Sequence, residues 1–403
     1  MRHIIVIGAG QAGSSLVAKL RAEKYVGKIT LIGEEAVLPY QRPPLSKKYL
    51  LGEMDLERLY LRPRAFYVDN QIDLHLAQTA VAIDRADKVV ITGGVSMPYD
   101  QLALTTGSVP RRLPASIGGE LGGVHVVRTL ADVDEMAAGV REGARLLVVG
   151  GGYIGLEAAA VAARRGMQVT LVEMADRILQ RVACRETSDY FRALHSDHGV
   201  DIREGVGLAR LLGQTQVTGA QLTDGTELTV DMVIVGVGIT PASGLAEAAG
   251  LEIDNGIKTD AYGQTSDPDI WSAGDCASFV FRGQRIRLES VQNAIDQAEV
   301  VAKNMLGAAE VYQPYPWFWS DQYDVKLQIA GLNTGYDDVV IRQGATKGSA
   351  SHWYFQADQL LAVDAMNDPR AYMVGKRLLE AGKSPAATVV GDSSVDLKSL
   401  LSG

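Results

Sequence analysis

Two glycine-rich turns carry the clearest chemistry in this sequence of 403 residues. The first, Gly8-Ala-Gly10-Gln-Ala-Gly13, directly follows the largely apolar residues 2–7. The second, Gly150-Gly-Gly152-Tyr-Ile-Gly155, follows the apolar residues 146–149 in the same way. In a turn of this spacing the first glycine permits the tight bend, the second lets a pyrophosphate approach the backbone, and the third lets helix and strand pack closely. Each turn therefore predicts a dinucleotide site at the N-terminus of the helix that follows.

A second strand and a terminal acid complete each of these units. After a segment with helical spacing, residues 28–32 lead to Glu34, and residues 168–172 lead to Glu173. A carboxylate at this point can accept hydrogen bonds from both hydroxyls of a ribose. Two complete βαβ units in one chain predict two nucleotide-binding domains and hence two bound dinucleotides.

The composition argues against several classes of function. The formal net charge of −9, from 39 basic and 48 acidic residues, disfavours binding to bulk nucleic acid, which needs a cationic surface. The two cysteines, Cys184 and Cys276, form no CxxC pair or disulfide framework. The six histidines lack metal-ligand spacing, so we expect no protein-bound metal. We recognise no signal peptide and no membrane-spanning apolar run, which predicts a cytoplasmic protein.

The order of the segments predicts three domains in an α/β protein. Residues 102–107 form an apolar strand that ends the first part, and the run that closes on Asp275 predicts a return to it. Beyond about Gln313 we expect antiparallel strands and a helix at residues 370–381. The predicted division is residues 1–108 with 237–312 for the first dinucleotide, 109–236 for the second, and 313–403 for a C-terminal α+β domain.

Several motifs together resemble a known family. The order GAGQAG, LALTTG, GGGYIGLE, GVGITP and WSAGDCA is that of two-dinucleotide flavoproteins with a glutathione-reductase-like fold, built from two Rossmann-type domains. The longer runs YQRPPLSKKYL, RIRLESVQNAIDQA, PWFWSDQY and LLAVDAMN resemble the FAD-dependent NADH:ferredoxin reductases of bacterial haem monooxygenase and aromatic dioxygenase systems, of putidaredoxin reductase type. The resemblance covers the whole chain. It implies FAD in the first unit, NADH in the second and a 2Fe-2S ferredoxin as the electron acceptor in a transient complex, and it leaves monomer or weak dimer open.

The resemblance also implies a set of contacts to FAD. Asp275 would hydrogen-bond the ribityl chain, and the helix that starts near Ser290 could direct its N-terminus, with Val291, at the flavin. A flavin can take two electrons as hydride and release them singly to an iron–sulfur protein. The full FAD set is Gly8, Gly10, Ala12, Gly13, Glu34, Arg42, Lys47, Val81, Arg128, Asp275 and Val291.

Four residues resemble the family's catalytic positions. Lys47 is similar to a lysine beside flavin N5, and its partner would be Glu157. Tyr153 matches an aromatic residue that covers the flavin until nicotinamide enters, and Trp319, near Trp317, matches the segment that faces the ferredoxin. The NADH set is Gly150, Gly152, Tyr153, Ile154, Gly155, Glu173 and Gly238.

Glu173 would also favour NADH, because a carboxylate repels a 2′-phosphate. The neighbouring Arg177 is the one residue that could oppose this choice. An acidic ferredoxin would need a local basic patch despite the negative net charge of the chain. We expect that patch at Arg282, Arg285 and Arg287, with Lys376 and Arg377 as alternatives.

One departure separates this chain from other flavoproteins of the fold. Glutathione-reductase-like members carry a cysteine pair beside the flavin, and NADH-peroxidase-like members carry one reactive cysteine, whereas this sequence has Pro43-Pro-Leu-Ser-Lys47. A disulfide or sulfenate relay is thereby excluded. The alternative functions are a rubredoxin or monodehydroascorbate reductase, and a redox-signalling flavoprotein of apoptosis-inducing-factor type; the net charge argues against the last.

Overall fold

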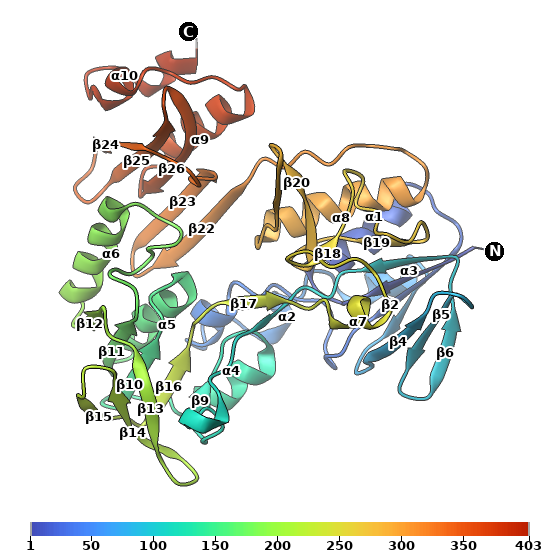
Figure 1. Ribbon diagram of the computed structural model, residues 1–403, viewed down its shortest axis with the longest axis horizontal. Coiled ribbons are helices and arrows are strands. Elements are labelled where there is room, and N and C mark those ends of the chain that lie inside the picture. Colours follow the sequence, from blue (N-terminus) through green and yellow to red (C-terminus); the bar gives the residue numbers. More distant parts are fainter. Residues whose placement is uncertain (1, 402–403) are drawn as a thin grey trace. The chain divides into compact units, whose positions relative to one another are not determined.

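The structure is a computed structural model that describes residues 2–401 (Figure 1). The chain forms two compact units, each assembled from segments that are distant in the sequence. Unit 1 consists of Met1–Arg42, Asp55–Val109 and Ile239–Pro314, and unit 2 consists of Pro43–Met54, Pro110–Gly238 and Tyr315–Gly403. No helix in the described range is both long enough and apolar enough to cross a membrane.

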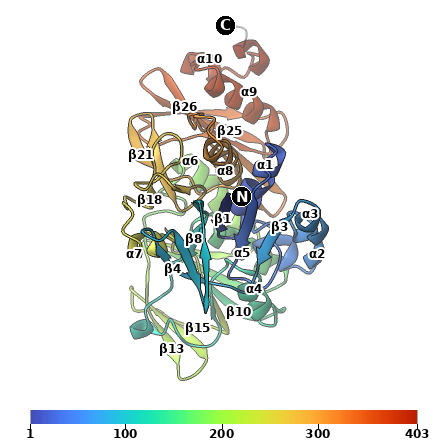
Figure 2. The same ribbon diagram turned by 90° about the vertical axis from the view of Figure 1, so that its right-hand side faces the viewer.

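Unit 1 is built on a five-stranded parallel sheet in the order β19-β7-β1-β2-β3. The central strand β1 (His3–Ile7) has four fully buried residues in succession, as expected for a parallel strand covered on both faces. Helices α1 (Gln11–Ala22) and α8 (Val291–Met305) lie side by side over one face (Figure 2), where Leu16, Leu20 and Val301 belong to one buried core.

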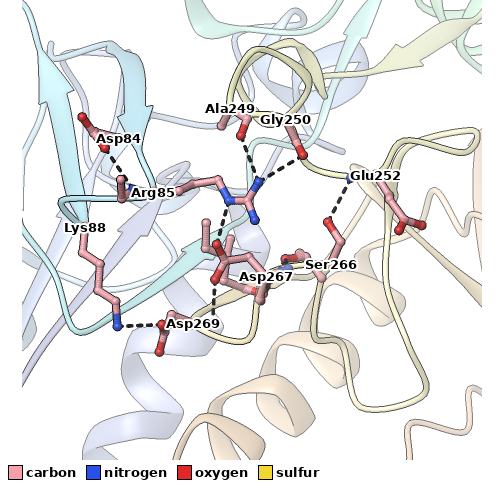
Figure 3. Close-up of polar contacts among 12 residues, drawn as sticks. Asp84, Arg85, Lys88, Ala249, Gly250, Glu252, Ser266, Asp267 and Asp269 are labelled. Atoms are coloured by element: carbon pink, nitrogen blue, oxygen red, sulfur yellow. Dashed lines mark hydrogen bonds and ion pairs between the residues drawn. The ribbon is translucent and has the colours of Figure 1, made fainter.

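The other face of this sheet carries a small antiparallel sheet, β4 (Ala80–Asp84), β5 (Val89–Thr92) and β6 (Val95–Pro98). Arg85, just after β4, fixes this sheet to two loops from the later part of the chain (Figure 3). Its Nε atom donates to Asp267 at 2.7 Å, and its Nη1 atom donates to the carbonyl oxygen of Gly250 at 3.1 Å. Lys88 adds an ion pair to Asp269 at 2.6 Å. These contacts join two segments of unit 1 that are more than 160 residues apart in the sequence.

The remaining elements of unit 1 are the other four strands of the parallel sheet, β2, β3, β7 and β19, and the elements outside that sheet. They are β2 (Lys28–Ile32), α2 (Leu56–Leu59), α3 (Arg64–Asp69), β3 (Ile72–His75), β7 (Gln101–Leu104), β8 (Ser108–Pro110), β17 (Ile239–Pro241), α7 (Gly244–Ala248), β18 (Ile257–Lys258), β19 (Ile270–Ser272), β20 (Ala277–Phe281) and β21 (Gln284–Ile286). Strands β18, β20 and β21 form a three-stranded sheet, and β8 pairs with β17.

Unit 2 contains a second five-stranded parallel sheet, in the order β12-β11-β10-β16-β9. Its β10 is again apolar and buried and again leads into a glycine turn. The elements of this part are β9 (Val124–His125), α4 (Leu130–Ala137), β10 (Arg145–Val149), α5 (Tyr153–Arg164), β11 (Gln168–Glu173), α6 (Arg185–Asp197), β12 (Asp201–Glu204), β13 (Leu208–Gly213), β14 (Val217–Leu222), β15 (Glu227–Thr229) and β16 (Met232–Val235).

The C-terminal part of unit 2 is a five-stranded antiparallel sheet in the order β22-β23-β26-β25-β24. Helix α9 (Pro369–Glu380) packs on β23 and β26. Its N-cap Asp368 accepts a hydrogen bond from the Ala371 N–H, which satisfies one unpaired donor of the first turn. The other elements are β22 (Trp317–Gln322), β23 (Val325–Gly331), β24 (Asp338–Gln343), β25 (Ala350–Gln356), β26 (Gln359–Met366) and α10 (Ala387–Gly391).

The predicted fold class is confirmed: two parallel-sheet βαβ parts and a C-terminal α+β part are present. The predicted domain boundaries stay a prediction. The sequence had suggested neither strand β22 nor the grouping of Pro43–Met54 with unit 2. Both omissions bear on the candidate site, because they bring together side chains that are far apart in the sequence.

Candidate functional site

The first glycine turn has the backbone geometry that a pyrophosphate site needs. Gly8 has φ +112°, and a Cβ there would lie 2.2 Å from the Thr105 carbonyl oxygen. A Cβ on Gly13 would lie 2.0 Å from the Gly8 carbonyl oxygen, so helix α1 approaches β1 as closely as backbone allows. A Cβ on Gly10 would meet no atom within 4 Å. The first and third glycines are thus required by the fold, whereas the second borders open space.

The second glycine turn repeats this arrangement. Gly150 has φ +107°, and a Cβ there would lie 2.4 Å from the Gly236 carbonyl oxygen. A Cβ on Gly155 would lie 2.1 Å from the Gly150 carbonyl oxygen. Gly152 again borders open space. Neither α1 nor α5 has a side-chain cap or an acid in its first turn, so their free N–H groups can bind phosphate. Both turns therefore fit a dinucleotide.

The acids after the two second strands differ in their partners. Glu34 is exposed, whereas its neighbour Glu35 accepts hydrogen bonds from Arg42 and from the Tyr40 hydroxyl, each at 2.6 Å. Arg42, which we predicted as an FAD contact, is thus held next to the predicted ribose acid by an ion pair to Glu35. If the Arg42 guanidinium contacts a phosphate of FAD, it must either share its donors between that phosphate and Glu35 or give up the ion pair to Glu35.

Glu173 is bound to its own glycine turn. Its Oε2 accepts from the Gly151 N–H at 2.7 Å, and its Oε1 accepts from the Ala175 N–H at 2.8 Å. Each carboxylate oxygen has a second lone pair, which leaves two acceptor positions for a ribose diol. Arg177 takes no part in this site among the described residues, because its guanidinium donates to the carbonyl oxygens of Ala183 and Cys184.

Several further residues of the predicted FAD set lie in unit 1. Asp275 accepts a hydrogen bond from the Ser108 hydroxyl at 2.9 Å, a partner that the sequence did not suggest. Ala12 lies in α1 under Gly274, whose Cβ would come within 3.0 Å of the Ala12 methyl group. Val291 is the first residue of α8, directly after the N-cap Ser290. Val81 is exposed at an irregular point of the β4-β5 pairing.

Lys47 and Glu157 form a buried ion pair within unit 2. The Lys47 Nζ lies 2.6 Å from Glu157 Oε2, and the two side chains are 17% and 3% exposed. The backbone of Lys47 departs from the geometry of its short helical turn, with φ −133° and ψ −111°. The Ser46 hydroxyl donates to the same oxygen at 2.9 Å, and the Ser320 hydroxyl donates to Oε1 at 2.7 Å. A pair this deeply buried and hydrogen-bonded differs from a surface ion pair, which contributes little.

Strand β22 contributes aromatic side chains, one of which contacts the start of α5. The ring of Tyr153 lies 5.1 Å from that of Phe318, with an interplanar angle of 40°. The Tyr153 hydroxyl is buried without a hydrogen-bond partner among the described residues, and its burial raises the pKa of this phenol. Trp319 lies 5.5 Å from Trp317, which also contacts Tyr372 of α9. An unpartnered buried hydroxyl next to an uncapped helix fits a site that a ligand completes.

The other predicted residues have ordinary environments. Ile154 is largely exposed on the first turn of α5, and Gly238 has φ +101° with its carbonyl oxygen bound by the Arg111 N–H. Arg128 is half-buried and precedes Thr129, the N-cap of α4. The surroundings of these three residues do not by themselves indicate a cofactor role.

The docking role of the expected basic patch stays a prediction, but two of its three arginines are bound to other groups within the fold. Arg285 donates to the Ser278 carbonyl oxygen at 2.7 Å and pairs with Asp254, and Arg287 pairs with Glu289 at 2.5 Å. Only Arg282 of this group is exposed. Burial against carbonyl groups consumes the guanidinium donors that docking would need. Of the alternatives, Lys376 pairs with Glu380, whereas Arg377 is exposed.

Neither cysteine is placed for redox chemistry. Cys184 and Cys276 are both buried and free, each in a different unit. Burial raises the pKa of the Cys184 thiol, which disfavours the reactive thiolate. Within residues 2–401 no group of three or more acidic, histidine or cysteine side chains could hold a metal ion.

Comparison with known proteins identifies the family. The family model described as pyridine nucleotide-disulphide oxidoreductase matches residues 2–298, and the model described as reductase C-terminal matches residues 317–401. The chain belongs to the pyridine nucleotide-disulphide oxidoreductase family. Within this family it is 44% identical to a ferredoxin–NAD(P)(+) reductase from Sphingomonas sp, over 94% of this chain and 92% of that protein.

Two further matches from the family cover almost the whole chain. Putidaredoxin reductase CamA from Pseudomonas putida is 39% identical, over 99% of this chain and 96% of that protein. The crystal structure of a covalent putidaredoxin reductase–putidaredoxin complex superposes with a TM-score of 0.96, at 39% identity, covering 100% of this chain and 98% of that chain. The protein is therefore an oxidoreductase of the flavoprotein class that uses FAD and a nicotinamide dinucleotide, and the family resemblance seen in the sequence is confirmed.

Proposed function

We propose that this protein is an NADH:ferredoxin reductase that takes hydride from NADH and passes electrons singly to a 2Fe-2S ferredoxin serving a monooxygenase or dioxygenase. The observation that carries the proposal is the open space beside Gly10 and beside Gly152, one at each parallel sheet. One hydride carries two electrons and one ferredoxin takes one, so each NADH reduces two ferredoxins and releases one proton. The names of the relatives support ferredoxin as the acceptor class.

The residues of unit 1 suit FAD. FAD, when bound, supplies the conversion of a two-electron hydride into two single electrons. The N–H groups at the start of α1 bind its pyrophosphate beside Gly10, and the exposed carboxylate of Glu34 accepts the ribose hydroxyls. Asp275, oriented by Ser108, accepts a hydrogen bond from the ribityl chain.

The residues of unit 2 suit NADH and the acceptor. Gly152 leaves room for the second pyrophosphate, and Glu173 accepts the adenosine ribose hydroxyls. The buried pair of Lys47 and Glu157 provides a fixed positive charge for the hydride step, and Tyr153 excludes water until nicotinamide binds. We assign Trp319 to the segment that faces the ferredoxin, because the run PWFWSDQY resembles that segment of the family.

We further propose that the enzyme acts in the cytoplasm, independently of nucleic acid and membranes. The net charge of −9 supports the first of these exclusions. The complex with ferredoxin is transient, and the enzyme itself is a monomer or weak dimer.

The test is a comparison of electron acceptors with the purified holoenzyme. We expect a yellow protein that NADH bleaches and that then reduces a 2Fe-2S ferredoxin at least tenfold faster than rubredoxin, monodehydroascorbate or oxygen. The variant Trp319→Ala should slow ferredoxin reduction and leave bleaching by NADH unchanged. Faster turnover with rubredoxin or monodehydroascorbate than with every ferredoxin of a panel would replace this function with the corresponding alternative.

A further inference from the structure

Strand β22 places three side chains against two helices of unit 2. Side chains alternate along a strand, so Phe318, Ser320 and Gln322 share one face. Phe318 contacts Tyr153, and Ser320 contacts Glu157, one turn further along α5. Gln322 reaches α6, where its Oε1 lies 2.8 Å from His195 Nε2. One face of β22 thus contacts both α5 and α6.

The polar members of this face form one continuous chain of hydrogen bonds. The Ser320 Oγ lies 2.7 Å from Glu157 Oε1 and 3.2 Å from Gln322 Nε2. The chain continues through His195 to the Tyr323 hydroxyl, which lies 3.3 Å from His195 Nδ1. Glu157, Ser320, Gln322 and His195 are each at most 3% exposed. Buried polar groups of this kind are costly unless every one is paired.

The charge on Glu157 fixes the position of every proton in the chain. An ionised carboxylate only accepts, so the Ser320 hydroxyl donates to it and must accept from the Gln322 amide nitrogen. The Gln322 amide oxygen then faces His195, which must carry its proton on Nε2. His195 Nδ1 is left as an acceptor, and the Tyr323 hydroxyl donates to it. All four bonds therefore point toward Glu157.

We propose that Ser320, Gln322 and His195 are positioning residues that hold the Glu157 carboxylate, and through it Lys47, in one fixed arrangement. This proposal rests on the proposed role of the Lys47–Glu157 pair in the hydride step. Oε2 of Glu157 accepts from Lys47 and Ser46, so Ser320 supplies the hydrogen bond that satisfies Oε1. Without it the carboxylate can rotate and take the lysine with it.

The chain orients groups and does not conduct protons. A primary amide such as that of Gln322 keeps both its protons at ordinary pH, so it interrupts any relay between His195 and Ser320. Burial also lowers the pKa of His195 to about 4, so the imidazole is neutral above that pH. The chain therefore keeps one direction over the whole physiological range.

The first experiment reads the His195 tautomer directly. In the holoenzyme labelled with ¹⁵N-histidine, we expect the His195 signals of an Nε2–H imidazole from pH 6 to pH 9. His352 provides an internal reference, because the Thr187 hydroxyl donates to Asp364 and so accepts from His352 Nδ1 at 2.8 Å, which requires the opposite tautomer. In Ser320→Ala the Gln322 amide loses its fixed orientation, and His195 should become a mixture of both tautomers while His352 is unchanged.

The second experiment measures flavin reduction by NADH in rapid mixing. Ser320→Ala should slow the step by about tenfold at saturating NADH, with KM for NADH and FAD content unchanged. In a Glu157→Gln background the same substitution should change the rate by less than twofold. Tyr323→Phe is the matched control, because it removes only the outermost hydrogen bond, and it should alter neither the rate nor the tautomer.

These outcomes separate the two proposals. If Lys47→Met reduces its flavin as fast as the parent enzyme, the role of the ion pair is wrong, whereas the tautomer spectra still decide whether the chain exists. An Nδ1–H tautomer of His195 in the parent enzyme would overturn the chain. A rate in Ser320→Ala within twofold of the parent, with Lys47→Met slow, would overturn the positioning role.

Discussion

The guanidinium of Arg177 donates to the carbonyl oxygen of Cys184 at 3.1 Å and to that of Ala183 at 2.8 Å. It also contacts the Ser188 hydroxyl. These bonds hold the segment that leads into α6, and they use the donors that could otherwise bind a 2′-phosphate. The residue that the sequence left as a possible counterweight to Glu173 therefore has a structural role within unit 2.

This arrangement predicts a preference for NADH and a way to weaken it. Met174 follows Glu173 and is 79% exposed, so a cation at this position meets no obstacle. We expect the double variant Glu173→Ala with Met174→Arg to raise the kcat/KM ratio of NADPH to NADH by at least tenfold, because it removes the repelling carboxylate and adds a charge. Met174→Leu is the control and should keep the parent ratio. A parent enzyme that uses NADPH as well as NADH would contradict the assignment.

The two glycine turns predict which nucleotide each unit binds. Gly10 has φ −95° and open space beside it, so Gly10→Leu should fold like the parent chain stripped of FAD, by circular dichroism, and should purify colourless. Gly152→Leu should stay yellow and react slowly with NADH. Gly13→Ala should instead lose folded protein, because its Cβ would lie 2.0 Å from the Gly8 carbonyl oxygen. Loss of flavin in Gly152→Leu alone would reverse the assignment.

Two buried histidines predict a loss of stability in acid. Burial lowers the pKa of both His195 and His352 to about 4, from about 6.5 in the unfolded chain. Their contribution to the free energy of unfolding is complete above pH 6.5 and falls as the pH drops to 4, by about 3 kcal/mol for each. His195→Gln keeps the Nε2 donor and cannot titrate, so its urea midpoint should vary less between pH 6.5 and 4. His198→Gln, which changes an exposed imidazole, should follow the parent curve.

The buried carboxyl group of Asp364 predicts a loss of stability as the pH rises, opposite to the effect of the two histidines. It is fully buried, accepts from Thr187 at 2.9 Å and from Tyr354, and has an unpartnered Oδ1 among the described residues. Burial raises its pKa to about 6 against 3.8, so its favourable contribution is complete below pH 3.8 and is lost as the pH rises through 6. Asp364→Asn keeps an acceptor oxygen without the charge. At pH 8 we expect it to be more stable than the parent by up to about 3 kcal/mol in urea unfolding; equal or lower stability would show that the buried charge is compensated.

Arg282 and Arg377 are the exposed arginines among the docking candidates, and they predict where ferredoxin docks. Arg282→Gln and Arg377→Gln should each raise the KM for ferredoxin at low ionic strength and reduce its salt dependence, with flavin reduction by NADH unchanged. Arg285→Gln is not a neutral control, because it removes bonds to buried carbonyl groups and should lower the thermal midpoint. If neither exposed arginine changes the KM, the acceptor docks through other residues.

The parts of the site that could be predicted are local in sequence. The roles of Gly8, Gly10 and Gly13 follow from their spacing, and the structure gives each the expected backbone environment. The pairing of Lys47 with Glu157 was implied by family resemblance and is present at 2.6 Å. The helices α1, α8 and α9 were expected from the sequence and are present.

The parts that could not be predicted depend on contacts between distant residues. Ser320 meets Glu157 across 163 positions, and nothing in the run Trp317–Gln322 indicates which face of a strand its serine takes. The arginines of residues 282–287 looked equivalent, yet their environments differ because Arg285 and Arg287 turn toward backbone carbonyl groups. The number of charged residues can be counted from a sequence, but the sequence does not show which of them stay exposed and which bind groups within the fold.

The bond from Arg85 to Asp267 has a consequence for synthesis of the protein on the ribosome. Asp267 and strand β19 at Ile270–Ser272 are made long after the strand β7 that ends at Leu104, although all of them belong to unit 1. At about 5–20 residues per second, the interval between β7 and β19 is roughly 8 to 30 s. During that time the edge of β7 that later pairs with β19 stays without its native partner, and an unpaired strand edge is a template for aggregation. We therefore expect the nascent chain to be most prone to aggregation while residues 105 to 270 are being made, and Asp275 of the predicted FAD set is made only after that interval.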